Sequence, residues 1–344
     1  MSKFTQVAST GLTLSIAAGE EASRIGDGKV DVEHVFLALV ISEGRAGRAL
    51  RDLGITLDRA RTAVTDMHRD QLASLGITAE IPSEGRIRFL EQGGRDWNER
   101  ALKLLTEAGG PRKAGDTAAV LRETLSEPSG VVEDILARLG TTPEKVRARL
   151  DATTPAVANG GAGNDDGEPG AHGQRKRRLM GSHTLARALT VFVPAAPDDV
   201  WALVSDAMRI PEWDLGIGTI TRDGSVWEGR ARTIAHDGRR VKVKPALRRQ
   251  TIERIAADAR HHVEWLMSYP DAPRGNRRSI IVDIAPATGG SDVTVQFAWV
   301  KVSGPTGFRK LVAPLTRMLA RPFVRFVVWT QALSLANGIS RALR

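Results

Sequence analysis

The sequence has no cysteine, which excludes disulfide bonds and thiolate chemistry. It also lacks any run of about 20 apolar residues, and its first residues lack the apolar core of a signal peptide. We therefore expect a cytoplasmic protein. The composition, 42% hydrophobic and 26% charged residues, is that of a globular protein, and the net charge of +9 favours acidic partners without identifying one.

Several motifs of enzymes and metal sites are missing as well. No Gly-rich loop ends in Lys followed by Ser or Thr, the arrangement that cradles nucleotide phosphates, and Gly28-Lys29-Val30 is the nearest approach. There is no nucleophile motif and no His-Glu-x-x-His or similar metal-ligand spacing. We therefore expect no ATPase activity, no bound metal and no cofactor.

The stretch 152–182 separates two unlike parts of the chain. Its middle, 157–173, consists largely of Gly, Asn, Asp and Pro, so ordering its backbone costs about 1–2 kcal/mol per residue with little apolar surface to offset that cost. A basic run, 175–178, follows it. We predict an N-terminal domain over 1–151, a flexible linker over 152–182 and a C-terminal domain over 183–344.

Apolar residues in 1–151 recur at helical spacing, and the order of the parts repeats. Helices are predicted over about 4–25, 32–40, 46–53 and 57–73, with stops at Gly26 and Gly54 and an N-cap at Asp31. The second copy starts with the apolar residues Ile87, Leu90, Trp97, Ala101, Leu104 and Leu105, and continues with helices near 118–125, 135–139 and 143–150. The pattern predicts an all-α domain of two four-helix repeats.

One segment of the first repeat carries a family resemblance. Val32-Glu33-His34-Val35-Phe36-Leu37-Ala38-Leu39, with Phe4-Thr5 before it and Leu53-Gly54-Ile55 after it, resembles the paired N-terminal repeats of unfoldases of the ClpA, ClpB and ClpC type. The resemblance implies a docking domain for adaptors or substrates, which in that family works beside separate ATPase rings.

The same resemblance points to two candidate partner-binding residues, Glu33 and His34. In ClpC-type domains the Glu of each Glu-His pair helps to hold a phosphorylated arginine. Glu33 matches one such position, whereas Thr117 stands at the other. The alternative is a structural role for both residues, as a charge at a helix start and a packed or capping histidine.

From residue 183 the apolar pattern changes to a period of two. We predict a strand over 184–193, short helices near 197–204 and 208–213, and strands over 216–222, 226–235, 240–243, 250–255, 261–268, 278–284 and 292–302. A long apolar helix follows over 306–343, bent or interrupted at Pro314 and Pro322. This order predicts an α+β helix-grip domain, in which an antiparallel sheet wraps around the last helix.

Two stretches of this half, 191–201 (VFVPAAPDDVW) and 210–213 (IPEW), resemble the START-like or SRPBCC superfamily of polyketide cyclases, dehydratases and lipid carriers. The resemblance and the predicted helix-grip both imply an apolar cavity between sheet and helix, fit for a hydrophobic small molecule or lipid.

Strand alternation predicts which residues line that cavity. His261, Val263, Trp265 and Met267 share one face of their strand, as do Val293, Val295, Phe297 and Trp299, and we expect both rows to face the long helix. The candidate ligand-binding residues are Trp213, His261, Trp265, Met267, Phe297 and Trp299. Plain core packing is the alternative for Trp265, Phe297 and Trp299.

The candidates for acid–base chemistry are His236, His261 with Glu264, and Asp214. His261 and Glu264 are three residues apart on a predicted strand and point to opposite faces, which leaves no local catalytic pair. We therefore predict a non-enzymatic two-module protein. Its START-like domain binds a hydrophobic small molecule, and its Clp-type repeats contact a protein partner.

The alternative to that function is a polyketide cyclase or dehydratase-like enzyme, with His236 and His261 as weak catalytic candidates. A third role, binding to nucleic acid or a membrane surface, would rest on 175–178 and on the basic residues of the last helix, Arg309, Lys310, Arg317, Arg321 and Arg325. We do not expect it to be the main function.

Overall fold

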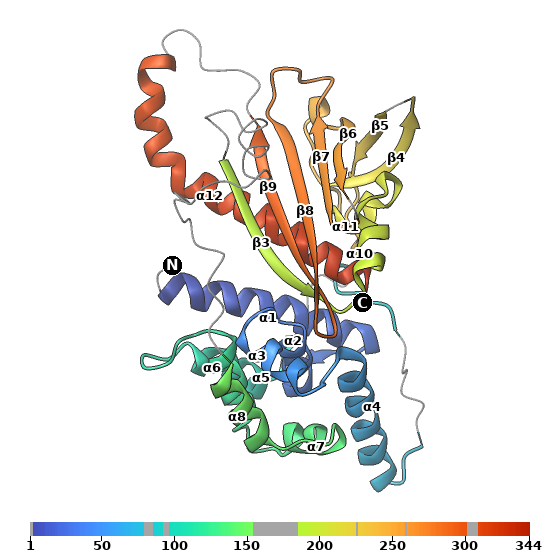
Figure 1. Cartoon of the computed structure of the whole chain (residues 1–344), viewed down its shortest axis with the longest axis vertical. Helices are drawn as coiled ribbons and strands as arrows, with labels where there is room; N and C mark the ends of the chain where they lie inside the picture. Colours follow the sequence, from blue (N-terminus) through green and yellow to red (C-terminus); the bar gives the residue numbers. More distant parts are fainter. Residues whose placement is uncertain are drawn as a thin grey trace. The chain divides into compact units, whose positions relative to one another are not determined.

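The computed structural model describes residues 3–78, 85–91, 96–153, 185–224, 226–258, 260–300 and 309–344. They form two units, each with its own hydrophobic core (Figure 1). Residues 154–184, which hold most of the predicted linker and the basic run 175–178, lie outside the described residues, so the predicted domain boundaries stay a prediction. None of the helices in the described ranges is both long and apolar enough to cross a membrane.

The N-terminal unit consists of two four-helix repeats, as predicted. The first contains α1 (Lys3–Ile25), α2 (Val32–Val40), α3 (Arg45–Asp52) and α4 (Leu57–Ser74), and the second contains α5 (Glu99–Ala108), α6 (Thr117–Thr124), α7 (Val131–Arg138) and α8 (Pro143–Ala152). Strands β1 (Lys29–Val30) and β2 (Asp96–Trp97), which were not predicted, pair in parallel. They bring the start of α5 beside the start of α2.

Matching N-caps support the repeat at the level of single residues. Asp31 caps α2 and Asp116 caps α6, each with its side chain accepting a backbone N–H of the first turn. Thr56 and Thr142 likewise cap α4 and α8. These side chains satisfy amide groups that have no partner within their helices, which is why each helix begins where it does.

The predicted start of the second repeat was wrong. The helix begins only at Glu99, because the Asn98 side chain caps it by accepting the N–H of Arg100 at 3.2 Å. Trp97 lies in β2, whose backbone pairs with β1 and is therefore not free to continue the helix. Ile87 and Leu90 lie in a non-helical segment, 85–91.

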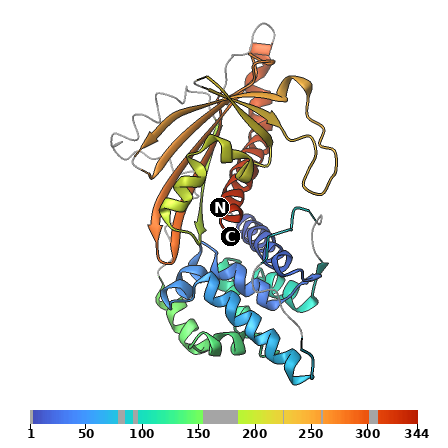
Figure 2. The same ribbon diagram turned by 90° about the vertical axis from the view of Figure 1, so that its right-hand side faces the viewer.

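The C-terminal unit is an antiparallel seven-stranded sheet that curves around one long helix (Figure 2). The strands are β3 (Leu185–Val193), β4 (Ile217–Asp223), β5 (Val226–Ala231), β6 (Arg249–Asp258), β7 (His262–Ser268), β8 (Arg277–Ala287) and β9 (Gly290–Val300), in the order β3-β9-β8-β7-β6-β5-β4. Between β3 and β4 lie α10 (Pro197–Val204), the 3-10 turn η1 (Ala207–Arg209) and α11 (Ile210–Trp213), and α12 (Arg309–Ala342) follows β9.

The core of this unit lies between the sheet and α12. The sheet contributes buried residues from alternate positions of its strands, and α12 contributes one stripe: Val328, Ala332, Leu335, Ala336 and Ile339. The helix-grip prediction is therefore confirmed. The helix is continuous through Pro314 and Pro322 and bends in its N-terminal part (Figure 1), so the predicted bend is present and the interruption is not.

Two strand predictions were wrong in detail. Residues 240–243 form no strand and make only an isolated bridge between Ile234 and Arg240, because β5 pairs directly with β6 and leaves no place for a strand between them. A short 3-10 turn, η2 (Pro245–Leu247), follows. In addition, β7 begins at His262, so His261 lies in the turn before the strand.

Near its C-terminal end, α12 touches α11 backbone to backbone. A Cβ atom at Gly338 would lie 2.0 Å from the carbonyl oxygen of Trp213. Real Cβ atoms do not approach so closely, so only glycine allows α12 to pack against α11 at this position.

Candidate functional site

The inner face of the sheet, which packs against α12, is lined by aromatic and apolar side chains. Trp265, Met267 and Phe297 are fully buried in the core, and Trp299 is half-buried beside them. The indole N–H of Trp265 donates to the carbonyl of Val204 at 2.9 Å. These side chains lie together as strand alternation predicts, but their burial alone does not distinguish core packing from ligand contact.

A buried ion pair is the main polar feature of this interior. Arg278 on β8 donates from Nη2 to Oδ2 of Asp214 at 2.7 Å, and only 10% and 5% of the two side chains are exposed. Oδ1 of Asp214 accepts the N–H of Gly216 at 2.9 Å, which fixes the carboxylate just after α11. The Arg209–Glu212 and Arg249–Asp271 pairs of this unit, by contrast, are exposed.

The surroundings keep Arg278 charged. Burial alone lowers the pKa of its guanidinium, but the negative charge of Asp214 and the nearby Tyr269 hydroxyl outweigh this, and the pKa lies above its ordinary value. Nε of Arg278 has no hydrogen-bond partner among the described residues, although it is buried. A fixed cation with an unused donor can hold an oxygen atom of a bound molecule.

Aromatic rings lie next to this cation. The Arg278 guanidinium carbon lies 5.7 Å from the centre of the Phe297 ring, and the Phe297 and Trp299 rings meet edge to face with centres 6.0 Å apart. Such contacts favour flat, electron-rich ligands as well as simple packing. This end of the inner face therefore combines apolar surface, aromatic rings and one charged donor.

Trp213 adds a second unused polar atom. Its side chain is fully buried, and its Nε1 has no hydrogen-bond partner in the part of the chain that the structure describes. A buried N–H without a partner costs about 1–3 kcal/mol, so such groups usually have a ligand or water nearby. Trp213 was predicted as a ligand-binding residue from sequence. Its Nε1 offers a hydrogen-bond donor for such a ligand.

The two histidines predicted as catalytic candidates, His236 and His261, lie outside this interior. His236 is exposed in the turn between β5 and β6, and His261 is exposed in the turn before β7. Neither lies on the buried inner face with Val263, Trp265 and Met267, because both stand in turns outside the strands. Glu264 is buried, but strand alternation places it on the face opposite Trp265. Of the predicted acid–base candidates, Asp214 is the one that lies in this interior.

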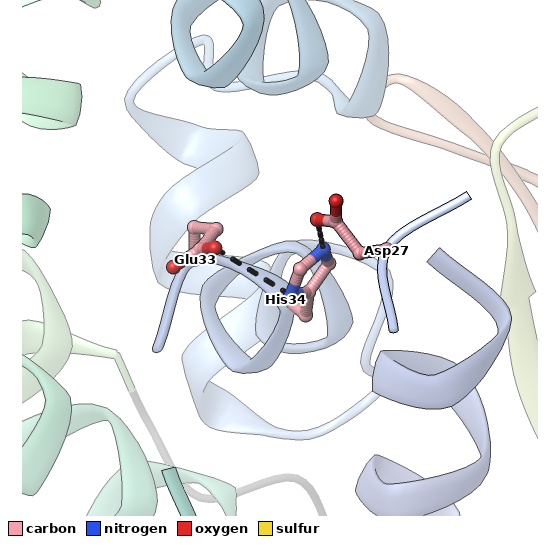
Figure 3. Close-up of side chains that lie close together, drawn as sticks. All are labelled: Asp27, Glu33 and His34. Carbon is pink, nitrogen blue, oxygen red and sulfur yellow. Dashed lines mark ion pairs between the residues drawn. The ribbon is translucent and has the colours of Figure 1, made fainter. Parts of the chain in front are cut away.

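In the N-terminal unit, Glu33 and His34 lie at the start of α2 (Figure 3). Nδ1 of His34 accepts the backbone N–H of Asp31 at 3.0 Å and completes a capping box, while its Nε2 lies 3.0 Å from Oδ2 of Asp27. Glu33 is largely buried, and its Oε1 lies 3.6 Å from Nδ1 of His34 and 3.7 Å from Nε2 of His68. The contacts of His34 are those of a capping residue, and a partner-binding role for Glu33 and His34 stays a prediction.

Asp27, Glu33 and His34 could in principle ligate a metal ion, since each offers one atom within 4.8 Å of the others. The donor set fits a metal poorly. Nδ1 of His34 already accepts the N–H of Asp31, so its lone pair is used in the helix cap. One histidine nitrogen and two carboxylates remain, and the cap explains their positions without an ion.

Sequence reasoning missed Arg278 and Tyr269. A usable signal was present for Arg278, which stands two residues before Ile280 and so shares the inner face of β8. A charged residue at an inward position of a strand indicates a buried partner or a ligand. Asp214 was considered from sequence, but only as an isolated carboxylate.

Residues 187–327 match the family model of polyketide cyclase / dehydrase and lipid transport proteins. The C-terminal half has the START-like helix-grip fold. Two solved structures resemble it. The Zhui aromatase/cyclase from Streptomyces sp. R1128 has 19% identity, covers 46% of this chain and 92% of its own, and has a TM-score of 0.33. A START superfamily protein from Mycobacterium smegmatis has 11% identity, covers 47% and 97%, and has a TM-score of 0.31.

The N-terminal half is Clp-like. It is similar to the chloroplastic chaperone protein ClpC2 of Oryza sativa subsp. japonica, with 28% identity over 178 residues, which is 48% of this chain. The chain spans only 17% of the length of that chaperone.

Proposed function

We propose that this protein binds a hydrophobic small molecule or lipid between the curved sheet and α12, and that its Clp-type repeats contact a protein partner. In this proposal it is a non-enzymatic, adaptor-like protein of the cytoplasm. The START-like half binds the ligand, and the repeat half brings the ligand-bound protein into contact with another protein.

One observation carries the ligand part of the proposal: the apolar inner face holds buried polar atoms that the described residues leave unused. Nε of Arg278 and Nε1 of Trp213 both lack partners among those residues. A core evolved for packing alone would avoid such groups, whereas ligand sites typically place a few polar atoms in an apolar lining.

Trp299 offers a direct test, because it is only half-buried and its truncation should leave the fold intact. Fatty acids and aromatic polyketides should raise the melting temperature of the intact chain, and an apolar molecule should be found by native mass spectrometry after purification. Trp299→Ala should weaken both effects, whereas Leu102→Ala, an exposed change in the repeat half, should not. Insensitivity of the wild-type chain to every compound would refute the ligand part.

A polyketide cyclase or dehydratase-like enzyme is the second candidate, favoured by the family match and by the Arg278 cation in an aromatic setting. A guanidinium in this position could hold a ketone oxygen while a folded chain closes a ring. Incubation with a poly-β-ketone substrate and mass-spectrometric detection of a dehydrated or cyclised product would favour the enzyme. Stoichiometric binding with no product favours the carrier.

The protein-partner part rests on the similarity to ClpC2 and on Glu33, which has 10% of its side chain exposed. Quantitative affinity capture should compare wild type with Glu33→Gln, using Glu107→Gln on the exposed face of α5 as the matched control. A partner that is lost only with Glu33→Gln supports a contact at the start of α2. Equal recovery from all three proteins contradicts it.

A further inference from the structure

The helix α12 carries an aromatic pair on the side that faces away from the sheet. Val328, Ala332 and Leu335 form part of the stripe that packs in the core of the helix-grip. Phe326 lies on the opposite side of the helix, and 59% of this residue is exposed. Its ring lies beside that of Trp329, with centres 6.0 Å apart. The pair lies outside the core of this half.

The sequence extends the line of Phe326 toward the start of α12 as an apolar line. Residues three, four and seven positions apart share one face of an α-helix. Counting back from Phe326 by seven, four and four positions gives Leu319, Leu315 and Leu311. By helical spacing, the first part of α12 therefore has a leucine line that ends at an exposed phenylalanine.

The line that faces the core changes character in the same direction. Counting back from Val328 by seven, four and seven positions gives Arg321, Arg317 and Lys310. In both ribbon views, the part of α12 before its bend extends beyond the sheet (Figure 1, Figure 2). A line that is apolar under the sheet and basic farther out agrees with a helix that leaves the sheet in its first part.

The charge of this part of the helix has one sign. Residues 309–329 contain five Lys and Arg residues and no Asp or Glu. So many charges exclude a helix that crosses a bilayer. A basic line opposite an apolar line with aromatic residues is instead typical of a helix that lies in the surface of an anionic membrane. Nucleic acid would use the cations but would leave Phe326 and the leucine line in water.

We propose that residues 309–329 bind the surface of a membrane that contains anionic lipids. The leucine line and Phe326 enter the boundary between head groups and acyl chains, and the cations contact the lipid phosphates. This role was not expected from the sequence as a main function. It requires that the apolar face of the helix be free of the sheet, and the exposure of Phe326 meets that requirement. The inference goes beyond the proposed function, because it uses the side of α12 that does not line the ligand site.

Co-flotation of the full chain with large vesicles tests the inference. One set of vesicles contains phosphatidylcholine alone, and the other also contains about 30% phosphatidylserine. The chain should bind the anionic vesicles at least about tenfold more tightly. Raising the salt concentration from about 0.05 to about 0.5 M should remove most of this difference, because the charges are screened. Equal binding to both sets, or binding to neither, would overturn the inference.

Phe326→Ala tests the apolar contact. The substitution should weaken binding to the anionic vesicles about tenfold, because the ring no longer leaves water on binding. The matched control is Met208→Ala, which truncates another exposed apolar residue of the same half and should bind like wild type. Circular dichroism should show that both variants are folded, as expected for side chains outside the core. Unchanged binding by Phe326→Ala contradicts the inference.

A pair of triple variants tests the cations. The first combines Arg317→Gln, Arg321→Gln and Arg325→Gln, and it should lose the preference for anionic vesicles. The second removes the same charge from three exposed residues between β5 and β6, and it should keep the preference; it combines Arg240→Gln, Lys242→Gln and Lys244→Gln. An equal loss in both variants would mean that net charge, and not α12, determines binding.

Tryptophan quenching reports which part of the chain meets the lipid. Anionic vesicles with brominated acyl chains should quench part of the fluorescence of the wild-type chain, and Trp329→Phe should lack that part. Equal quenching in both proteins would place a different segment at the membrane and overturn the inference. Binding to duplex DNA without binding to vesicles would also overturn it. None of these results depends on a ligand between sheet and helix, so this inference and the proposed function can fail separately.

Discussion

The two halves of this protein use their polar groups in different ways. In the Clp-like half, Asp31, Asp116, Thr56 and Thr142 cap helices, and the buried Arg51 donates to the backbone carbonyls of Val40 and Ser42. In the START-like half, the buried Asp214–Arg278 pair leaves Nε of Arg278 without a partner among the described residues. The first arrangement stabilises the fold, whereas the second leaves a hydrogen-bond donor that a bound molecule can use.

Breaking the buried pair should give the largest effect. Asp214→Ala leaves the Arg278 charge buried and uncompensated, so it should cost about 3–5 kcal/mol in the free energy of unfolding of the START-like half. Tryptophan fluorescence reports this half, which holds six of the seven tryptophans. Glu212→Gln in the exposed Arg209 pair should cost less than about 1 kcal/mol, and equal costs would contradict the assigned burial.

The caps of the two repeats should differ in strength. The Asp31 carboxylate accepts the backbone N–H of Val32. It also accepts hydrogen bonds from the side chains of Asn98, at 2.8 Å, and Arg100, at 3.1 Å. Among the described residues, the Asp116 side chain accepts only the N–H of Ala119, at 2.9 Å. Urea unfolding followed at 222 nm should show a loss of about 2 kcal/mol for Asp31→Ala and about 1 kcal/mol for Asp116→Ala. The reverse order would show that the bonds between repeats contribute nothing.

A smaller, pH-dependent effect is expected at the start of α8. The backbone amide of Glu144 and the hydroxyl of Thr142 lower the pKa of the Glu144 carboxyl below its ordinary value of 4.5. Because the folded-state pKa is the lower one, the stabilisation is present above pH 4.5 and is lost as the pH falls through the folded-state pKa. The stability of wild type and Glu144→Gln should therefore converge in acid, and a constant difference down to pH 3 would contradict this assignment.

Separating the halves should have the smallest effect of all. Each half has its own core, so cleavage within 159–170, which lies outside the described residues, should yield two folded fragments. Their calorimetric transitions should add up to that of the intact chain. A drop of many degrees in either fragment would mean that the halves depend on each other for stability.

Much of the fold could be predicted because its signals are local. The 3.6-residue period, the Asp31 cap and the strand alternation of Val293, Val295 and Phe297 each depend on near neighbours in sequence. The errors arose where pairing between distant segments determines the structure. Trp97 lies in β2, which pairs with β1, and 240–243 has no strand to pair with. Nothing within either segment indicates which partner is present.

The candidate site could be predicted only in part for the same reason. Alternation identifies the apolar lining, but the Asp214–Arg278 pair joins residues 64 positions apart, and no local pattern specifies it. The one-residue error at His261 moved a predicted ligand residue out of the strand.

The contact between Gly338 and Trp213 bears on the rate of ligand exchange. Where two backbones touch, no side chain can rotate aside, so opening requires movement of α12 itself, a motion of microseconds to milliseconds. The exchange of a ligand bound between the sheet and α12 should therefore be limited by movement of the helix on this timescale, and not by rotation of a side chain at the contact.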